Sequence, residues 1–196
     1  MFCLYLAQLR GTIREEAYDR LVAELQRLPE KMEEILSDCE QIKHYASLYF
    51  NHDSIFFIGR NLDYAMGLEG SLKLKEISYV HSDAYAAGEL KHGTISLIED
   101  GTLVIGVLTQ SHLCEKTLSN MQEVKSRGAY LMGVAENGSY YLEDMVDFVV
   151  YVPKTDPHFT TTLAIIPLQL MGYYVSVAKG LDVDKPRNLA KSVTVE

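Results

Sequence analysis

Residues 101–108 have the sequence Gly-Thr-Leu-Val-Ile-Gly-Val-Leu, in which a turn residue precedes an almost uninterrupted apolar run. Short apolar runs bounded by turn residues are typical of strands that are buried on both faces of a sheet. A second run of this kind, residues 54–58, ends at Gly59. The two runs therefore predict buried strands over 102–108 and 54–58.

Helical and strand patterns alternate outward from these two runs. Such alternation implies right-handed crossovers and a parallel sheet that helices cover on both faces. The sequence therefore predicts an α/β three-layer sandwich with a mostly parallel, five-stranded sheet. The other predicted strands are 84–87, 129–134 and 147–152, and the predicted helices of this part are 64–77, 88–98, 113–127 and 159–179.

The patterns divide the chain into three parts. Residues 1–50 are expected to form a helical lead-in that packs on the domain, with Pro29 starting its second helix. Residues 51–180 contain the α/β domain, and residues 181–196 form a polar tail. The two helices of the lead-in are predicted over 12–28 and 30–49.

Composition limits the possible functions. The chain has 196 residues, of which 47% are hydrophobic, and a formal net charge of -9, so one substantial core is expected. The negative charge argues against nucleic acid and anionic membranes as partners, because both need clustered Lys and Arg. Three cysteines without a C-x-x-C pair indicate a reducing compartment, so we expect a cytoplasmic protein. The longest apolar segment, Phe159–Ala178, is interrupted by threonines and Pro167, which favours a buried helix over a membrane span.

Three charged residues share one face of the helix predicted over 64–77. Glu69, Lys73 and Glu76 are spaced i, i+4 and i+7, after a strand whose carboxyl end borders the usual ligand crevice of such folds. Two carboxylates beside an ammonium can handle protons, because the lysine holds one carboxylate ionised while the other stays near a neutral pKa. The spacing alone favours a solvated charge stripe instead.

His92 and Lys191 are further candidates for chemistry. An imidazole such as that of His92, which lies between Gly88 and Gly93, can accept and return a proton near pH 7, as the opening of a cyclic sugar requires. Lys191 attacks a ketose carbonyl only as a neutral amine, so its pKa must be lowered. A surface histidine and a frayed terminus are the more frequent explanations of such residues.

Residues 109–111, Thr-Gln-Ser, follow the strongest strand and offer hydroxyl and N–H donors to a phosphate. No glycine accompanies them, although close backbone approach to a phosphate normally needs one, so a structural role is favoured. The histidines have no metal-ligand spacing, and neither a metal nor a cofactor is expected.

Three longer runs resemble one family. In order and in amino-acid sequence, these runs are similar to the second sugar-isomerase (SIS) domain of glucosamine-6-phosphate synthase, the glutamine-dependent fructose-6-phosphate aminotransferase. The resemblance implies a flavodoxin-like SIS fold, and it is looser over the first two helices and over 114–151. The runs are LEGSLKLKEISY over 68–79, AYAAGELKHG over 84–93 and DKPRNLAKSVTVE over 184–196.

The resemblance implies a role for each candidate residue. Glu76 would move a proton between carbons 1 and 2 of the sugar, with Glu69 and Lys73 beside it. Lys191 would form a Schiff base with the open ketose, and the backbone of Ala190 would lie against the sugar.

The resemblance also implies partners. His92 would open the ring of fructose 6-phosphate in the active site of a neighbouring subunit, which implies a homodimer. The family enzyme has an N-terminal glutaminase and a first SIS domain with a phosphate loop, and neither is expected here, because Cys3 is not terminal and residues 109–111 are only a degenerate form of that loop. We therefore expect part of an enzyme that converts fructose 6-phosphate and glutamine to glucosamine 6-phosphate and glutamate, with little turnover alone.

Two alternatives stay open at this point. The chain could bind a sugar phosphate without catalysis, since fold does not establish activity, or it could be a fructosamine-phosphate deglycase, which the tail sequence disfavours. A pure binder has no reason to keep Glu76, His92 and Lys191 together. The enzymatic interpretation makes one spatial prediction, that Glu76 and Lys191 meet around a common cavity.

Overall fold

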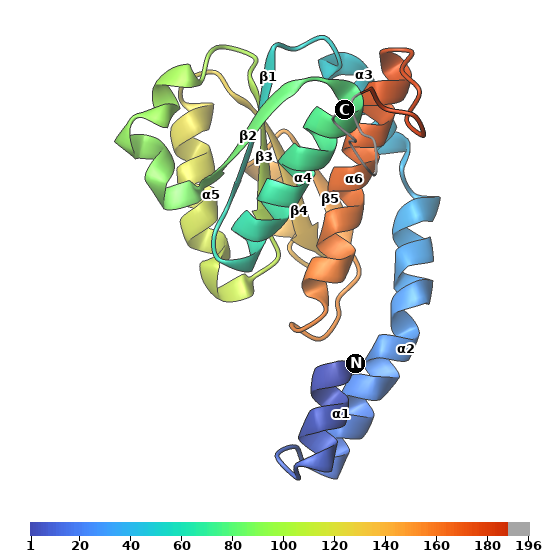
Figure 1. Cartoon of the computed structure of the whole chain (residues 1–196). Coiled ribbons are helices and arrows are strands. Elements are labelled where there is room, and N and C mark those ends of the chain that lie inside the picture. The colour runs from blue at the N-terminus through green and yellow to red at the C-terminus, as the bar shows by residue number, and fades with distance from the viewer. Residues whose placement is uncertain (188–196) are drawn as a thin grey trace, which may run out of the picture.

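A five-stranded sheet forms the centre of the molecule, and helices cover both of its faces (Figure 1). The computed structural model describes residues 1–187. All neighbouring strands are parallel, in the order β2-β1-β3-β4-β5, so the predicted α/β three-layer sandwich is confirmed. The strands are β1 Ser54–Gly59, β2 His81–Ala86, β3 Leu103–Leu108, β4 Tyr130–Glu136 and β5 Phe148–Val152.

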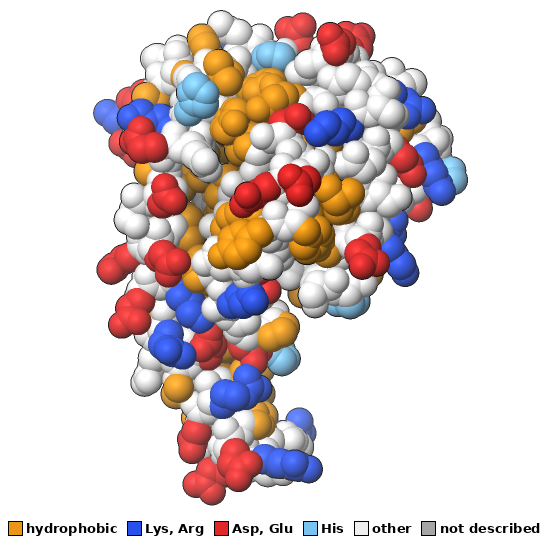
Figure 2. All heavy atoms as spheres, turned by 180° about the vertical axis from the view of Figure 1, so that it is seen from behind, with side chains coloured by type: hydrophobic (Ala, Val, Ile, Leu, Met, Phe, Trp, Pro, Cys, Tyr) orange, Lys and Arg blue, Asp and Glu red, His pale blue; other side chains and the backbone are white. Residues whose placement is uncertain are grey.

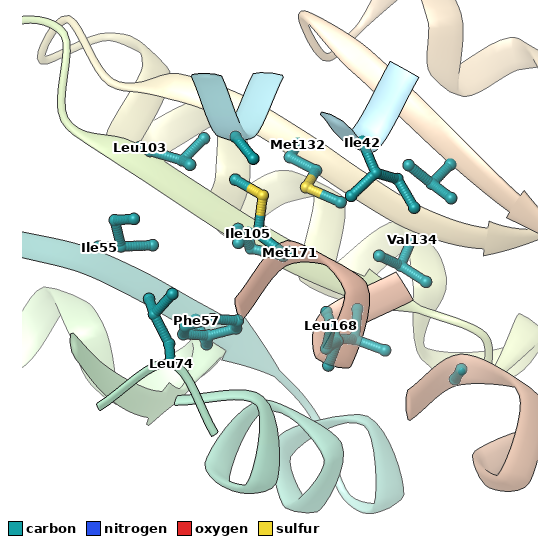
Figure 3. Packing of buried hydrophobic residues seen from close by; sticks show 14 of the residues in the cluster. Ile42, Ile55, Phe57, Leu74, Leu103, Ile105, Met132, Val134, Leu168 and Met171 are labelled. Atoms are coloured by element: carbon teal, nitrogen blue, oxygen red, sulfur yellow. The ribbon is translucent and has the colours of Figure 1, made fainter. Parts of the chain in front are cut away.

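Alternate residues of β1, β3, β4 and β5 enter two separate cores, which is why these four strands are apolar along most of their length. Phe57 of β1 enters the first core and packs near Leu74 and Leu168 (Figure 3). Its neighbour Phe56 enters the second core, on the other face. The helices of the first face are α3 Glu40–Tyr49, α4 Leu62–Ser78 and α6 Thr160–Ala178, and those of the second are α5 Ser111–Lys125 with the short 3-10 helices η1 Ala87–His92 and η2 Thr94–Leu97.

Helix α6 is long and apolar enough to cross a membrane when judged by length and composition alone. It supplies Leu163, Leu168 and Met171 to the first core and lies beside α4. The prediction of a buried helix over this segment is therefore confirmed.

The helical lead-in differs from its prediction at Pro29. A single helix, α2 Glu15–Ser37, runs through the proline, and the break before α3 comes at Asp38. Leu21, Leu28 and Ile35 are buried at intervals of seven residues, so packing of this stripe maintains the helix across a residue that lacks an N–H. The predicted boundary at Pro29 is therefore wrong.

The N-terminal end of the lead-in projects from the domain. Helix α1 Phe2–Leu9 packs against α2, and together they extend away from the sheet (Figure 1). Acidic and basic side chains are interspersed along this projection (Figure 2). Of the buried residues of α2, only Leu28 and Ile35, in its later turns, belong to the first core.

Residues 88–98 also differ from their prediction. The expected helix is replaced by η1 and η2, which meet at Gly93. Gly93 has a φ of 148°, a conformation that ends a helix and that residues with a Cβ rarely adopt. The expected strand over 84–87 is present but begins earlier, at His81.

Candidate active site

Helix α4 carries the three charged residues that the sequence singles out, and the structure brings them together. The Nζ atom of Lys73 lies 2.7 Å from Oε2 of Glu76 and 3.5 Å from Oε1 of Glu69. The side chains of Lys73 and Glu76 are 32% and 25% exposed, so the pair is half-buried yet open to small molecules. The hydrogen bond to Glu76 raises the pKa of Lys73, which keeps this side chain a cation at neutral pH.

The position of Glu76 in the fold differs from the expected crevice. Helix α4 begins after the carboxyl end of β1 and ends before His81, which pairs with Ser54 at the amino end of β1. The helix therefore runs about 25 Å back along the sheet, at about 1.5 Å per residue. Glu76, in its last turn, lies toward the amino edge of the sheet, so the rule that places ligands at the carboxyl edge does not locate it.

At the carboxyl edge, the loop after β3 is bonded to a side chain of the protein itself. Asp63, in the first turn of α4, is 1% exposed and accepts the N–H groups of Thr109 at 3.1 Å and of Gln110 at 3.2 Å. It also accepts the Thr109 hydroxyl. Three of the donors that residues 109–111 could offer a phosphate are therefore already bonded within the protein, which agrees with a structural role for this loop.

A small cavity of about 160 Å³ remains beside this loop, lined by Thr109, His112, Glu136 and Thr160 among others. Glu136 receives a hydrogen bond from the Thr160 hydroxyl at 3.2 Å. Burial raises the pKa of Glu136, although that hydrogen bond acts in the opposite direction. A carboxyl group at this position disfavours a phosphate, because ionised it would repel the ligand.

His92 lies apart from the charged residues of α4. It is exposed at the end of η1, the element that follows the carboxyl end of β2. The six residues of β2 separate this edge from the amino edge, a span of about 17 Å at about 3.3 Å per residue. Within one chain, the structure therefore does not bring His92 to Glu76.

The start of the tail is held at the end of α4. Arg187 donates its backbone N–H to the Tyr79 hydroxyl at 2.7 Å, and its guanidinium lies 4.0 Å from the centre of the Tyr79 ring. Tyr79 follows Glu76 by three residues. Ala190 and Lys191 lie outside the described residues.

Three residues that shape this region have no recognisable signal in the sequence. A single carboxylate at the start of a helix, such as Asp63, is an ordinary feature. Tyr79 and Arg187 lie inside the runs that resemble the family, but they are 108 positions apart and no spacing pattern links them. Among residues 1–187, no group of three or more His, Cys, Asp or Glu residues is arranged to hold a metal ion.

Curated relatives match this chain over its whole length. The glutamine-fructose-6-phosphate aminotransferase (isomerizing) of Clostridium tetani is 54% identical over 196 residues, and the protein of the same name from Caldanaerobacter subterraneus subsp. tengcongensis is 52% identical over 201 residues. Both alignments cover 100% of this chain, but only 32% and 33% of the relatives. The chain thus spans about a third of the length of these curated relatives.

Solved structures and a family comparison agree with this similarity. The C-terminal domain of glucosamine-fructose-6-phosphate aminotransferase from Francisella tularensis has a TM-score of 0.85 and 32% identity, over 94% of this chain and 52% of that one. Glucosamine-6-phosphate deaminase from Thermotoga maritima has a TM-score of 0.65 and 26% identity, over 97% and 53% of the two chains. The SIS domain family matches residues 48–179. The chain therefore belongs to the SIS domain family.

Proposed function

We propose that this chain provides the isomerase residues of an enzyme that converts fructose 6-phosphate and glutamine to glucosamine 6-phosphate and glutamate. The observation that carries the proposal is the 54% identity, along the entire chain, to a relative named for this aminotransferase activity. The arrangement of Glu69, Lys73 and Glu76 supports it, because a carboxylate beside a fixed cation is suited to proton transfer.

Glu76 and Lys73 have separate roles in this proposal. Glu76 moves the proton between carbons 1 and 2 of the open sugar, which converts a ketose derivative to an aldose derivative. Lys73 stays protonated, because its hydrogen bond to Glu76 raises its pKa, so it acts as a positive charge and not as a nucleophile. Glu69, whose Oε1 lies 3.5 Å from the same ammonium, helps to hold it in place.

Lys191 is the proposed nucleophile. Its amine attacks the carbonyl carbon of the open ketose, and loss of water leaves the Schiff base. Arg187, anchored on Tyr79, precedes Lys191 by four residues, and four residues of extended chain span at most about 14 Å. The length of the tail is therefore compatible with delivery of Lys191 to the region of Glu76, with Ala190 beside the sugar.

We further propose a homodimer in which His92 serves the site of the second copy. His92 is exposed and lies at the opposite edge of the sheet from Glu76 in its own chain. A ring-opening histidine must contact the sugar, so a neighbouring subunit is the simplest source. A cytoplasmic location remains a prediction from the cysteine content.

A preceding SIS domain and a glutaminase would complete the enzyme. Leu68 and Leu72 are 46% and 43% exposed one turn apart on α4, beside Glu69 and Lys73, and such an exposed apolar pair favours cover by another domain. Because Asp63 accepts the Thr109 and Gln110 N–H groups, residues 1–187 show no phosphate site built on this loop at the carboxyl edge of the sheet. Phosphate binding by the preceding SIS domain would orient the open sugar, so we expect weak turnover from this chain alone.

The test uses a chimera in which this chain replaces the matching C-terminal third of the Clostridium tetani relative. Borohydride reduction in the presence of fructose 6-phosphate should attach the sugar to Lys191, as detected by peptide mass, and Lys191→Ala should abolish the adduct. Glu76→Gln should keep the adduct but lose formation of glucosamine 6-phosphate. Binding of fructose 6-phosphate with neither adduct nor product would contradict the proposal and indicate a non-catalytic module.

A further inference from the structure

The backbone of Tyr79 adopts a conformation that usually belongs to glycine. Tyr79 ends α4 with a φ of 59° and a ψ of 19°, and its N–H donates to the carbonyl of Lys75. Glycine is the common residue at such a helix end, because a Cβ crowds the backbone there. A strained residue that persists is a reason to ask what its side chain does.

The side chain of Tyr79 makes two separable contacts with Arg187. The hydroxyl accepts the backbone N–H of Arg187 at 2.7 Å, a contact that does not depend on the arginine side chain. The ring faces the guanidinium, whose central carbon lies 4.0 Å from the ring centre. Hydroxyl and ring can therefore be tested one at a time.

The chain before Arg187 is turned toward this position by local hydrogen bonds. Gly180 has a φ of 68° after α6, and the N–H of Leu181 returns to the carbonyl of Ser176. Asp182 then accepts the N–H groups of Asp184 and Lys185 through one carboxylate oxygen. The segment between α6 and Arg187 is thus shaped before it meets Tyr79.

We propose that Tyr79 is a positioning residue that docks Arg187 and thereby holds the C-terminal segment at the end of α4, near Glu76. The consequence for catalysis rests on the proposed function of Lys191. Each of the two contacts changes the ratio of docked to undocked chains by about three- to tenfold, as is usual for an exposed cation–π contact or a neutral hydrogen bond. Contacts of this size make the docking of Arg187 on Tyr79 reversible.

The first experiment measures docking in this chain without substrate. Trypsin cleaves after Arg187 only when the guanidinium leaves the Tyr79 ring, and Lys185 is not a competing site because Pro186 follows it. Tyr79→Gly should raise the cleavage rate after Arg187 by about ten- to hundredfold, since both contacts are lost, and Tyr79→Phe by about three- to tenfold. Cleavage after the exposed Arg10 should not change.

Loss of the fold cannot explain this result for the glycine variant. Tyr79→Gly relieves the positive φ, so its thermal midpoint should be equal to that of the wild type or higher. Tyr173→Phe, at an exposed tyrosine of α6, is the matched control and should leave cleavage after Arg187 unchanged. Equal cleavage rates for wild type and Tyr79→Gly would overturn the proposal.

The second experiment tests the consequence for Lys191 in the chimera. Tyr79→Gly should lower the rate of borohydride trapping on Lys191 at subsaturating fructose 6-phosphate by about tenfold or more, with Tyr79→Phe in between. Arg187→Gln keeps the backbone N–H and removes the cation, and Arg187→Lys should recover part of its loss. A purely structural role would not produce that recovery.

Together, the two experiments distinguish failure of the proposed function from failure of the positioning role of Tyr79. If no variant, wild type included, forms an adduct on Lys191 while the cleavage pattern holds, the proposed function fails and the docking role of Tyr79 stands. If Tyr79→Gly traps the sugar as fast as the wild type, the positioning role is overturned and the proposed function stands.

Discussion

The two ends of helix α4 each carry a carboxylate, but in opposite surroundings. Asp63 in the first turn is 1% exposed and accepts two N–H groups and a hydroxyl from Thr109 and Gln110. Glu76 in the last turn has a side chain that is 25% exposed and has one ammonium partner, Lys73. Burial and hydrogen-bond donors therefore assign the first carboxylate to structure, and accessibility leaves the second free for chemistry.

This contrast explains why the candidate site lies at the amino edge of the sheet and not at the carboxyl edge. Parallel α/β sheets usually bind ligands at the carboxyl edge, where N–H groups at helix starts are free to hold an anion. Here Asp63 already accepts hydrogen bonds from the N–H groups of Thr109 and Gln110, just before α5. The opposite edge carries Glu76 together with the contact between Tyr79 and Arg187.

The largest expected effect is on the open end of the helix. Glu76→Gln in the chimera should lower the rate of glucosamine 6-phosphate formation by about 10²- to 10⁴-fold, because the proposed proton-transfer group is lost. Stability should hardly change, since the side chain is partly exposed. A steady-state assay and thermal unfolding measure the two effects, and a rate within a factor of three of the wild type would remove Glu76 from the mechanism.

The next effect is expected at the closed end. Asp63→Ala should lower the free energy of unfolding by about 2–4 kcal/mol, because three donors lose a buried acceptor. The exposed Asp144→Ala is the control and should change stability by less than about 0.5 kcal/mol. Urea unfolding compares the two, and equal effects would mean that Asp63 does not hold the loop at Thr109.

The pH dependence of stability tests the burial of Asp63 directly. Burial raises the pKa of Asp63, against hydrogen bonds from Thr109 and Gln110 that act in the opposite direction. A raised pKa contributes stability that is present below the unfolded value of about 3.8 and is lost as pH rises through the folded value. The stability of wild type minus that of Asp63→Asn should therefore decrease from pH about 4 toward neutrality, and an increase would contradict this.

A small stability effect is expected for Lys73, the partner of Glu76. Lys73→Met should change the free energy of unfolding by about 1 kcal/mol or less, because the ion pair is partly exposed. The raised pKa of Lys73 means that the pair persists until pH exceeds about 10.5, so this small difference should be constant through neutral pH. Product formation in the chimera should fall while trapping on Lys191 continues. A loss of trapping equal to the loss of product would instead assign Lys73 to sugar binding.

Local patterns in the sequence were sufficient to predict the buried strands of the sheet, but they missed the first half of the polar strand β2. The run at 103–108 is apolar because it is buried on both faces, so its strand follows from composition alone. The lead-in was harder, since Pro29 ends most helices and only the tertiary burial of Leu28 and Ile35 maintains α2 across it.

The candidate site was predictable only where its residues are close in the sequence. Glu69, Lys73 and Glu76 lie on one helix, so their proximity follows from helical spacing. The separation of His92 from Glu76 depends on which edge of the sheet each residue reaches, which spacing does not encode. The contact between Tyr79 and Arg187 joins two distant segments and needed the structure itself.

The central claim, that the end of the chain meets Glu76, is tested most directly by crosslinking. In this chain with Cys3, Cys39 and Cys114 replaced by serine, Glu76→Cys combined with Lys191→Cys should form an intrachain crosslink with a short bismaleimide, identified by peptide mass. Tyr79→Cys with Arg187→Cys is the positive control, because these residues are in contact. Crosslinking of the control pair without any link between positions 76 and 191, with or without fructose 6-phosphate, would contradict the account.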